Sequence, residues 1–309
     1  MPAISVIMSI RNDEGNFLSQ SIESILNQSF KNFEFIIILD GSNKITKQKV
    51  EYYKNSDPRL SIINQNNLGL TKSLNVAIRK SRADLIVRQD YDDVSELNRL
   101  EYLYKYMLKN SDIVLSGSNC IKINEKNSII GKIKVESNYK KLKKKITYFN
   151  PLIHPSVIFR KKILEEFNFY NENYSVSQDY ELWSKVSKKY KISNNNSYLL
   201  RLRIHKDSIS SNNNFLQRKY SFYINIKNKF TKFEKIIDQN INSDIFEFIK
   251  LIENEDKEII NFVNSRMFVL FYDKIKIYSL FRYNFKTLCL ILIYYFNRPK
   301  YLILRLLNI

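Results

Sequence analysis

The chain is predicted to be an α/β protein in which a mostly parallel, doubly wound sheet is flanked by helices and followed by a helical C-terminal region. Strand-like and helix-like patterns alternate from Ala3 to Lys109. The first strand-like runs are apolar at nearly every position, which is typical of strands buried on both faces. All five glycines lie between Gly15 and Gly131. Because glycine permits sharp turns and close ligand approach, ligand-binding loops are expected in the first half.

The expected elements follow one another in a regular order. The first two strands are expected at Ala3–Ile10 and Phe33–Leu39, and weaker strand patterns occur at Leu60–Asn64, Asp84–Arg88 and Asp112–Ser116. Helical patterns lie between them, at Phe17–Gln28, Lys44–Lys54, Thr71–Ser81 and Glu96–Lys109. This order favours parallel strands with right-handed crossovers, and ligands of such sheets bind beyond the carboxyl ends of the strands.

The composition changes after Gly131. A nearly unbroken basic run, Lys140–Lys145, precedes apolar and aromatic segments around Pro151–Phe159 and Tyr180–Val186. We place a domain boundary at Asn212–Asn214, because the residues that follow show only helical patterns and contain no proline before Pro299. The predicted domains are therefore residues 1–211 and 212–309.

Composition and charge restrict the classes of protein to which this chain can belong. The 309 residues include 50 Lys and Arg against 31 Asp and Glu, a net charge of +19. Two distant cysteines, Cys120 and Cys289, form no metal-site or disulfide pattern, which favours a reducing compartment. The start lacks the basic segment of a signal peptide, and no apolar stretch reaches the ~18–20 residues of a spanning helix. A cytoplasmic protein is expected.

Acidic residues follow two of the expected strands. Arg88-Gln89-Asp90-Tyr91-Asp92-Asp93 places three carboxylates directly after a strand, where they can converge on Mg²⁺ or Mn²⁺. A solvated acidic turn that caps the next helix is an equally good interpretation of this run alone. Asp40 follows another strand and can accept hydrogen bonds from a nucleobase or ribose, although an Asp-Gly turn needs no ligand.

Six segments, in order, resemble blocks of the family 2 glycosyltransferases, which have the GT-A fold. They are SVIMSIRND, SIESILNQSFKNFEFIIILDGS, NNLGLTKSLNVAIRKSRADLIVRQDYDDVS, HPSVIFRK, QDYELW and LRLRIHKDSIS. Together they cover roughly Ala3 to Ser210, about two thirds of the chain. The resemblance implies transfer of a hexosyl group from a UDP-sugar to a hydroxyl of a glycan acceptor. A lipid-linked acceptor in bacterial surface-polysaccharide or lipooligosaccharide synthesis is expected.

The resemblance also assigns residues. Asp179 matches the catalytic base, with a helix-start acid as the structural alternative. Asp92 and His205 match the metal site, and Gln178 and His154 the acceptor or phosphate pocket, although His154 is equally well explained as a packing residue. The residues assigned to nucleotide-sugar binding are Ser9, Arg11, Asp40, Lys72, Arg88, Asp90 and Tyr91. For Lys72 and Arg88, which could contact the phosphates, a solvated surface role is the default alternative. Two departures from the family pattern are Leu39 before Asp40 and Gln178, each in place of an acid.

These residue types suit a single displacement that inverts the anomeric centre. A divalent cation can neutralise the charge that grows on the departing diphosphate. A carboxylate within ~3 Å of the acceptor hydroxyl can take its proton, which is worth about 10²–10⁴-fold in rate.

The excess of positive charge could suit a nucleic acid, but the chain has no nucleic-acid motif and its acidic loop would repel a polyanion. We therefore expect a different anionic partner. Residues 259–309 contain eight Lys or Arg, one acid and many aromatic and aliphatic residues. Such a composition is typical of helices that bind an anionic membrane surface, here the inner face of the cytoplasmic membrane. Packing of these helices on the catalytic domain or on a second subunit is the alternative. The oligomeric state is left open.

Two other functions fit parts of the pattern. A nucleotidyltransferase has a similar sheet and similar acids, but it needs a glycine-rich and basic phosphate loop where this chain has Ser9–Asn16. A non-catalytic glycan-binding or membrane-binding module would have no need for Asp90, Asp92 and Asp179. The sequence does not specify the donor sugar, the acceptor or the linkage.

Overall fold

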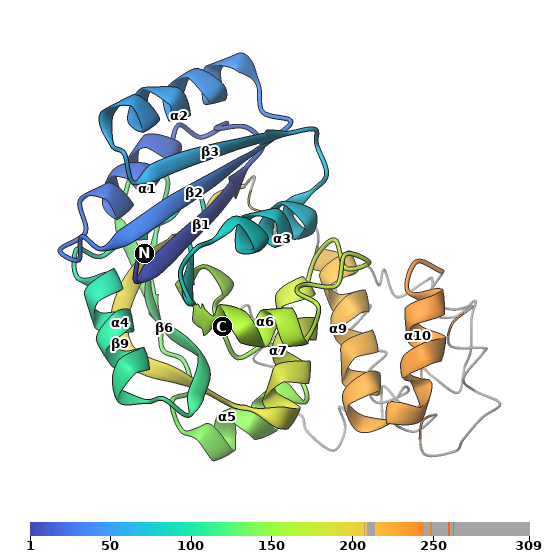
Figure 1. The fold of residues 1–309 in the computed structure, drawn as a ribbon. Helices are drawn as coiled ribbons and strands as arrows, with labels where there is room; N and C mark the ends of the chain where they lie inside the picture. The colour runs from blue at the N-terminus through green and yellow to red at the C-terminus, as the bar shows by residue number, and fades with distance from the viewer. Residues whose placement is uncertain (207, 209–213, 244–247, 249–258, 260–261, 263–309) are drawn as a thin grey trace. The chain divides into compact units, whose positions relative to one another are not determined.

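A computed structural model describes residues 1–206, 208, 214–243, 248, 259 and 262 (Figure 1). The predicted α/β class is confirmed, and the parallel half of the sheet is built as expected. Its strands are arranged in the order β3-β2-β1-β4, and all three pairings are parallel. Their bounds are β1 Ile4–Ile10, β2 Phe33–Asp40, β3 Leu60–Gln65 and β4 Leu85–Arg88, each within one residue of the expected strand at either end.

The helices of this half cover both faces of the sheet. They are α1 Leu18–Leu26, α2 Lys44–Ser56, α3 Leu70–Lys80 and, after the acidic loop, α4 Arg99–Lys109. Alternate strand residues such as Val6 and Phe35 form one core cluster with α1, α2 and α4. Residues of the opposite parity, such as Ile7 and Ile36, are also buried, and α3 packs on β1 and β2 from the other side (Figure 1). This two-sided burial explains why the strand-like runs of the sequence are apolar at nearly every position.

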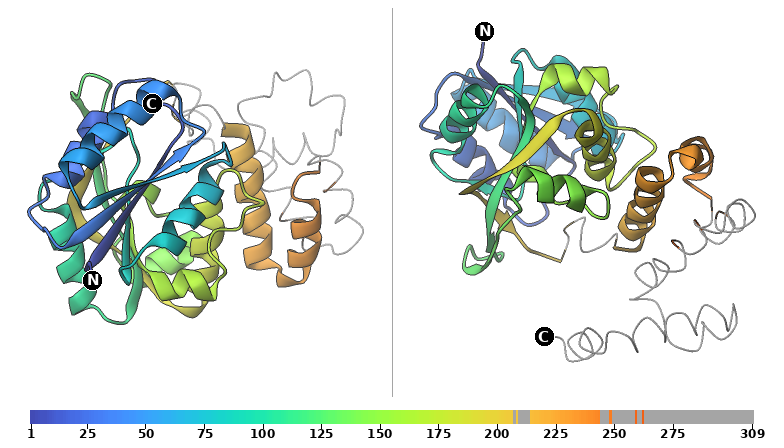
Figure 2. Two further views of the ribbon diagram at one scale, coloured as in Figure 1. Left: turned by 45° about the horizontal axis from the view of Figure 1, so that its top comes forward. Right: turned by 90° about the horizontal axis from the view of Figure 1, so that it is seen from below.

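The rest of the sheet is mixed rather than parallel. The full order is β3-β2-β1-β4-β8-β6-β9-β5, with β7 paired to β6. The expected strand at Asp112–Ser116 is the start of a longer strand, β6 Ile113–Ile123, and it does not pair with β4, because β8 Ile158–Arg160 lies between them and is antiparallel to both. The remaining strands are β5 Val94–Ser95, β7 Ile129–Ile133 and β9 Lys191–Arg203, the last running across this half of the sheet (Figure 2).

Four short helical elements complete this part of the chain. They are α5 Tyr139–Ile146, the 3₁₀ turn η1 His154–Ser156, α6 Lys161–Glu166 and α7 Gln178–Lys189. The basic run of the sequence lies within α5, and the apolar segment Tyr180–Val186 lies within α7. Helix α5 packs on both α7 and β9.

The chain divides into two compact units, Met1–Asn212 and Asn213–Ile309. The described part of the second unit contains α9 Asn214–Lys229, the 3₁₀ turn η2 Thr231–Phe233 and α10 Glu234–Asn240. Lys227 joins α9 to α10 through an ion pair of 2.8 Å with Asp238. Apart from Ile259 and Phe262, the basic segment 259–309 lies outside the described residues. Within the described residues, no helix is both long and apolar enough to cross a membrane.

Candidate active site

Strand pairing brings three separate stretches of the chain to the carboxyl end of β4. The acidic loop Gln89–Asp93 follows β4 directly. Because β8 is antiparallel to β4, the turn η1 that precedes β8 lies beside the end of β4, and the Arg88 amide donates a hydrogen bond to the Val157 carbonyl. Strand β9 is antiparallel to β5, with Val94 opposite Arg201, so the end of β9 lies next to the acidic loop.

The acidic loop forms a group of three carboxylates. One ligand oxygen from each of Asp90, Asp92 and Asp93 lies within 4.8 Å of the others. Asp93 is 1% exposed, and among the described residues its Oδ2 has no hydrogen-bond partner. Burial, followed by the charges of Asp92 and Asp90, raises the pKa of Asp93 well above its usual value. Closely spaced hard oxygen ligands of this kind fit a divalent cation, which would relieve their repulsion.

His205 lies against this group. Its Nε2 is 2.8 Å from Asp92 Oδ2, and its ring packs 5.2 Å from the Phe17 ring. The structure therefore brings together the two residues matched to the metal site, Asp92 and His205, and adds Asp93. Asp93 is the third carboxylate of the acidic run considered in the sequence, although the family resemblance assigned only Asp92 and His205 to the metal.

Arg203, at the end of β9, holds the acidic loop in place and was not identified from the sequence. Its Nε donates to the Asp92 carbonyl at 2.7 Å, and its amide donates to Asp93 Oδ1 at 2.9 Å. The guanidinium also donates to Gln20 Oε1 and to the Asn124 carbonyl. Nothing in the local sequence of β9 indicates contacts across more than a hundred residues.

Arg88 and Asp90 form a two-pronged ion pair. The Arg88 Nη1 lies 2.6 Å from Asp90 Oδ2, and Nη2 lies 2.5 Å from Oδ1. Burial lowers the pKa of Arg88, but the Asp90 carboxylate outweighs this effect and the pKa is raised. Burial raises the pKa of Asp90, Arg88 lowers it and Asp92 raises it, and the net shift is upward. Arg88 is thus a buried partner of Asp90 and not an exposed cation.

Asp179 lies in the first turn of α7. Its Oδ2 accepts a hydrogen bond of 2.6 Å from Asn150 Nδ2. Burial raises the pKa of Asp179, against the lowering effects of the Tyr180 amide, Arg88 and Asn150. The charge of Asp179 in turn raises the pKa of both Arg88 and Asp90. The predicted base and the acidic loop therefore share one electrostatic environment.

His154 belongs to an aromatic cluster beside Asp179. Its Nε2 and the Tyr170 hydroxyl are hydrogen bonded at 2.9 Å, and its ring meets those of Tyr170 and Trp183 edge-on. Burial, and then the Arg88 charge, lower the pKa of His154 well below its usual value. The histidine is neutral at pH 7, so its 4.0 Å approach to Asp179 Oδ2 is not an ion pair. Gln178 is also buried, and among the described residues its Oε1 has no partner.

Asp40, at the end of β2, organises the loop before α3. Its Oδ1 accepts from Gln65 Nε2 and from the Leu68 amide, and its Oδ2 accepts from the Gly69 amide, all at 2.8–2.9 Å. Gly41 has a φ of +67°, and a Cβ there would lie 2.9 Å from the Asn67 nitrogen. The Asp-Gly pair is therefore specified by this loop, whatever else Asp40 contacts.

The other residues matched to nucleotide-sugar binding surround this edge of the sheet. Ser9 is partly buried at the end of β1, and Arg11 is exposed just beyond it. Lys72 is exposed in the first turns of α3, next to the loop that Asp40 holds. Tyr91 is half-buried against the core, and burial followed by the charges of Asp92 and Asp90 raises its pKa.

Arg99 lies beneath the site and was not identified from the sequence. It is 0% exposed. Its Nη1 donates to Gln89 Oε1 and Ser95 Oγ, and its Nη2 donates to the Arg88 and Pro155 carbonyls at 2.7 and 2.6 Å. Burial lowers the pKa of Arg99 to about 10, so it is still a cation at neutral pH. One side chain thus ties the start of the acidic loop to η1.

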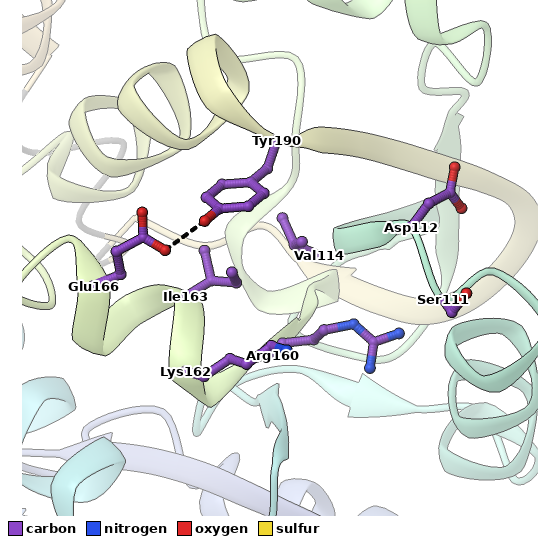
Figure 3. A pocket seen from close by; sticks show the side chains of 8 residues that line it. All are labelled: Ser111, Asp112, Val114, Arg160, Lys162, Ile163, Glu166 and Tyr190. Atoms are coloured by element: carbon purple, nitrogen blue, oxygen red, sulfur yellow. Dashed lines mark hydrogen bonds between the residues drawn. The ribbon is translucent and has the colours of Figure 1, made fainter.

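A separate pocket lies at the other end of the sheet (Figure 3). It is near Arg160, which pairs with Leu85 at the start of β4, whereas the acidic loop follows the last residue of that strand. None of the carboxylates described above lines it. The lining residues are Ser111, Asp112, Val114, Arg160, Lys162, Ile163, Glu166 and Tyr190.

Residues 5–167 match the family model for glycosyl transferase family 2. An uncharacterized glycosyltransferase of Methanocaldococcus jannaschii is 36% identical over 231 residues, covering 72% of this chain and 78% of the relative. The O-antigen biosynthesis glycosyltransferase WbnJ of Escherichia coli is 35% identical over 210 residues, covering 66% and 81%. The UDP-Gal:alpha-D-GlcNAc-diphosphoundecaprenol beta-1,3-galactosyltransferase of Escherichia coli is 31% identical over 194 residues, covering 60% and 67%.

A crystal structure of S. aureus TarS in complex with UDP is similar in fold. The TM-score is 0.56 at 19% sequence identity, and the match covers 74% of this chain. This chain spans 65% of that structure, slightly less than two thirds. The likeness confirms the GT-A type of fold expected from the resemblance.

Proposed function

The chain belongs to glycosyl transferase family 2 and is a glycosyltransferase, and on that premise we propose that it transfers a sugar from a UDP-sugar to a hydroxyl of a glycan acceptor with inversion at the anomeric carbon. The observation that carries this proposal is geometric: Asp179 lies 4.0 Å from His154 in η1, and Arg99 ties η1 to the Arg88 carbonyl at the start of the acidic loop. Family membership favours this reaction over the nucleotidyltransferase and the non-catalytic module considered above.

In the proposed reaction, the acceptor oxygen forms a bond to the anomeric carbon while the bond from that carbon to the diphosphate breaks. The acceptor proton moves to a carboxylate oxygen of Asp179, and UDP leaves with the bonding electron pair. Asn150 holds Asp179 Oδ2 and so orients the carboxylate. The neutral His154 lies 4.0 Å from Asp179 Oδ2, beside the same carboxylate.

A divalent cation, Mn²⁺ or Mg²⁺, held by Asp90, Asp92 and Asp93 would neutralise the charge on the departing diphosphate. His205 would orient Asp92 through its 2.8 Å contact. The Oδ2 of Asp93, which has no hydrogen-bond partner among the described residues, supports this assignment.

The donor and acceptor classes rest on similarity. TarS was crystallised with UDP, which supports a uridine nucleotide as the leaving group. One relative acts in O-antigen biosynthesis and another on a diphosphoundecaprenol-linked sugar, which supports a lipid-linked glycan acceptor. We therefore place the protein peripherally on the inner face of the cytoplasmic membrane, with residues 1–211 as the catalytic domain and 212–309 as a helical, membrane-associating region.

Two substitutions test the proposal. Asp179→Asn is expected to reduce transfer by about 10²–10⁴-fold, because it removes the proton acceptor, while UDP-sugar binding in the presence of Mn²⁺ is retained. Asp92→Asn is expected to weaken metal-dependent UDP-sugar binding as well as transfer. Titration calorimetry and a UDP-release assay measure the two effects separately. The exposed Asp112→Asn is the matched control and is expected to change neither. Near-normal turnover of Asp179→Asn would show that another group is the base.

A further inference from the structure

Helix α5 and the residues after it form an exposed, basic and aromatic surface. We call it the α5 surface, and it consists of Lys140, Lys141, Lys143, Lys144, Tyr148 and Phe149, all of them exposed. Within the described part of the chain, Lys145 is the one lysine of α5 that pairs with an acid, Glu136, at 3.1 Å. The ion pairs of the described residues include none of the four exposed lysines. Four positively charged side chains therefore project from one short helix, and among the described residues none of them forms a salt bridge.

The packing of α5 explains why these lysines point outward. Leu142 and Ile146, four positions apart, are buried, and the helix packs through this side on α7 and β9. Asn138 caps the helix by accepting a hydrogen bond from the Lys141 amide. The apolar side is thus already used within the protein. Like charges three and four positions apart destabilise a helix, so folding alone does not account for this set of lysines.

The α5 surface leads directly to the proposed base. Phe149 is 50% exposed, and the next residue, Asn150, donates a hydrogen bond to Asp179. Lys144 and Asn150 are six positions apart, so even a fully extended chain would place them at most roughly 20 Å apart. A partner bound to the α5 surface therefore lies next to the acceptor side of the proposed active site.

We propose that the α5 surface binds the anionic face of a lipid bilayer and thereby presents Asp179 to an acceptor held in that bilayer. Clustered lysines are attracted to anionic headgroups, and exposed aromatic side chains beside them suit the boundary between headgroups and acyl chains. A soluble polyanion would use the lysines but not the aromatic pair. This inference rests on the proposed function for its acceptor, and it is independent of residues 259–309.

The test is co-sedimentation of the full chain with vesicles of phosphatidylglycerol and phosphatidylethanolamine, with phosphatidylcholine vesicles as the neutral reference. Each lysine contributes about fivefold to binding. The variant Lys140→Gln/Lys141→Gln/Lys143→Gln/Lys144→Gln is thus expected to lose about 600-fold in partitioning. The matched control replaces four exposed lysines dispersed over other elements, Lys31, Lys54, Lys80 and Lys109, by Gln, with the same change in net charge, and is expected to lose much less. Equal losses in the two variants would show that only net charge matters and would overturn the proposal.

A second variant and a second assay separate the other outcomes. Phe149→Ser is expected to lower vesicle binding severalfold while leaving binding to polyphosphate unchanged. Equal loss in both would identify a soluble polyanion as the partner and overturn the bilayer assignment. Metal-dependent UDP-sugar binding is measured in parallel and is expected to be normal in all these variants. Its absence from the unsubstituted protein would refute the proposed function, whereas its retention with unchanged vesicle binding in the α5 variant would refute only the membrane inference.

Discussion

At the scale of single residues, Asp93 is a buried carboxylate whose charge is poorly compensated. Its Oδ1 accepts from the Arg203 amide, but its Oδ2 has no partner among the described residues, and Asp90 and Asp92 are close. Such a group is costly for folding without a cation and useful for binding one. Stability and metal affinity should therefore respond in opposite directions when it is changed.

Asp93→Asn is expected to stabilise the metal-free protein by about 1 kcal/mol, or roughly 2–4 °C in melting temperature, at neutral pH. Burial first, and then the neighbouring carboxylates, raise the pKa of Asp93 in the folded state above that in the unfolded chain. The native protein therefore loses stability as the pH rises from the unfolded to the folded pKa, and the asparagine variant loses less, because Asp90 and Asp179 still contribute. Thermal unfolding in EDTA across this pH range measures the difference.

The same variant is expected to bind Mn²⁺ at least about tenfold more weakly, because one carboxylate is lost. An unchanged affinity for Mn²⁺ would remove Asp93 from the metal site. A lower melting temperature at every pH would mean that the second oxygen has a partner in the protein.

The raised pKa of Asp179 predicts how the transfer rate depends on pH. Burial, outweighing the effects of the Tyr180 amide, Arg88 and Asn150, raises its pKa. Because the base acts as a carboxylate, the transfer rate at saturating donor is expected to fall as the pH is lowered through that raised pKa, above the ordinary value for aspartate. Initial rates over an acidic pH series measure the inflection. Asn150→Ala removes a hydrogen bond that favours the carboxylate and should move the inflection to higher pH.

The site residues that could be predicted from the sequence are those whose positions follow from local pattern. Asp40 and Asp90 stand where a strand ends, and such residues gather at one edge of a parallel sheet. Arg99, Arg203 and Asn150 act across long stretches of sequence, from α4 to η1, from β9 to the acidic loop and from the end of α5 to α7. No local periodicity encodes such contacts.

At the scale of elements, the turn after β2 depends on a single glycine. Gly41→Ala places a Cβ 2.8–2.9 Å from Asn67 at a φ of +67°. Because both the conformation and the space exclude a side chain, the expected cost is about 2–4 kcal/mol of stability. Weaker UDP-sugar binding should accompany it, since Asp40 holds the same loop. Chemical denaturation and calorimetry measure the two effects.

Gly131→Ala is the matched control for that substitution. A Cβ at Gly131 would meet only Lys122 Cδ, at 3.7 Å, which is an ordinary contact. This variant is expected to retain both stability and binding. If the two glycine variants were equally stable, the tight approach of Asn67 to Gly41 would be refuted.

Among the elements, predictability follows apolar content and length. Strands β1 and β2 are mostly apolar, and their bounds were predicted to within one residue. Strand β8 has three residues, and β9 begins with the polar stretch KISNNNS, so neither has the pattern of a buried strand. Their partners lie more than forty residues away, and this distance is why the mixed half of the sheet was not predicted.

At the scale of the whole molecule, ligand binding should appear as thermal stability. UDP with Mn²⁺ at about 100 times its dissociation constant is expected to add about 2.7 kcal/mol, because it binds only the folded chain. This corresponds to a rise in melting temperature of roughly 5–10 °C. Differential scanning fluorimetry measures it, and EDTA should reverse most of the shift. ADP is the control nucleotide, and an equal shift with ADP would contradict selection of uridine.

The buried Arg99 has a consequence for the exchange of loops between related proteins. Its guanidinium donates hydrogen bonds both to the Arg88 carbonyl, which directly precedes the acidic loop, and to the Pro155 carbonyl in η1. An acidic loop, Gln89 included, that is transferred into a relative would therefore lose these hydrogen bonds unless Arg99 and the η1 backbone were transferred with it. The smallest unit of this enzyme that could be exchanged therefore consists of the acidic loop, the first turn of α4 and the distant 3₁₀ turn η1.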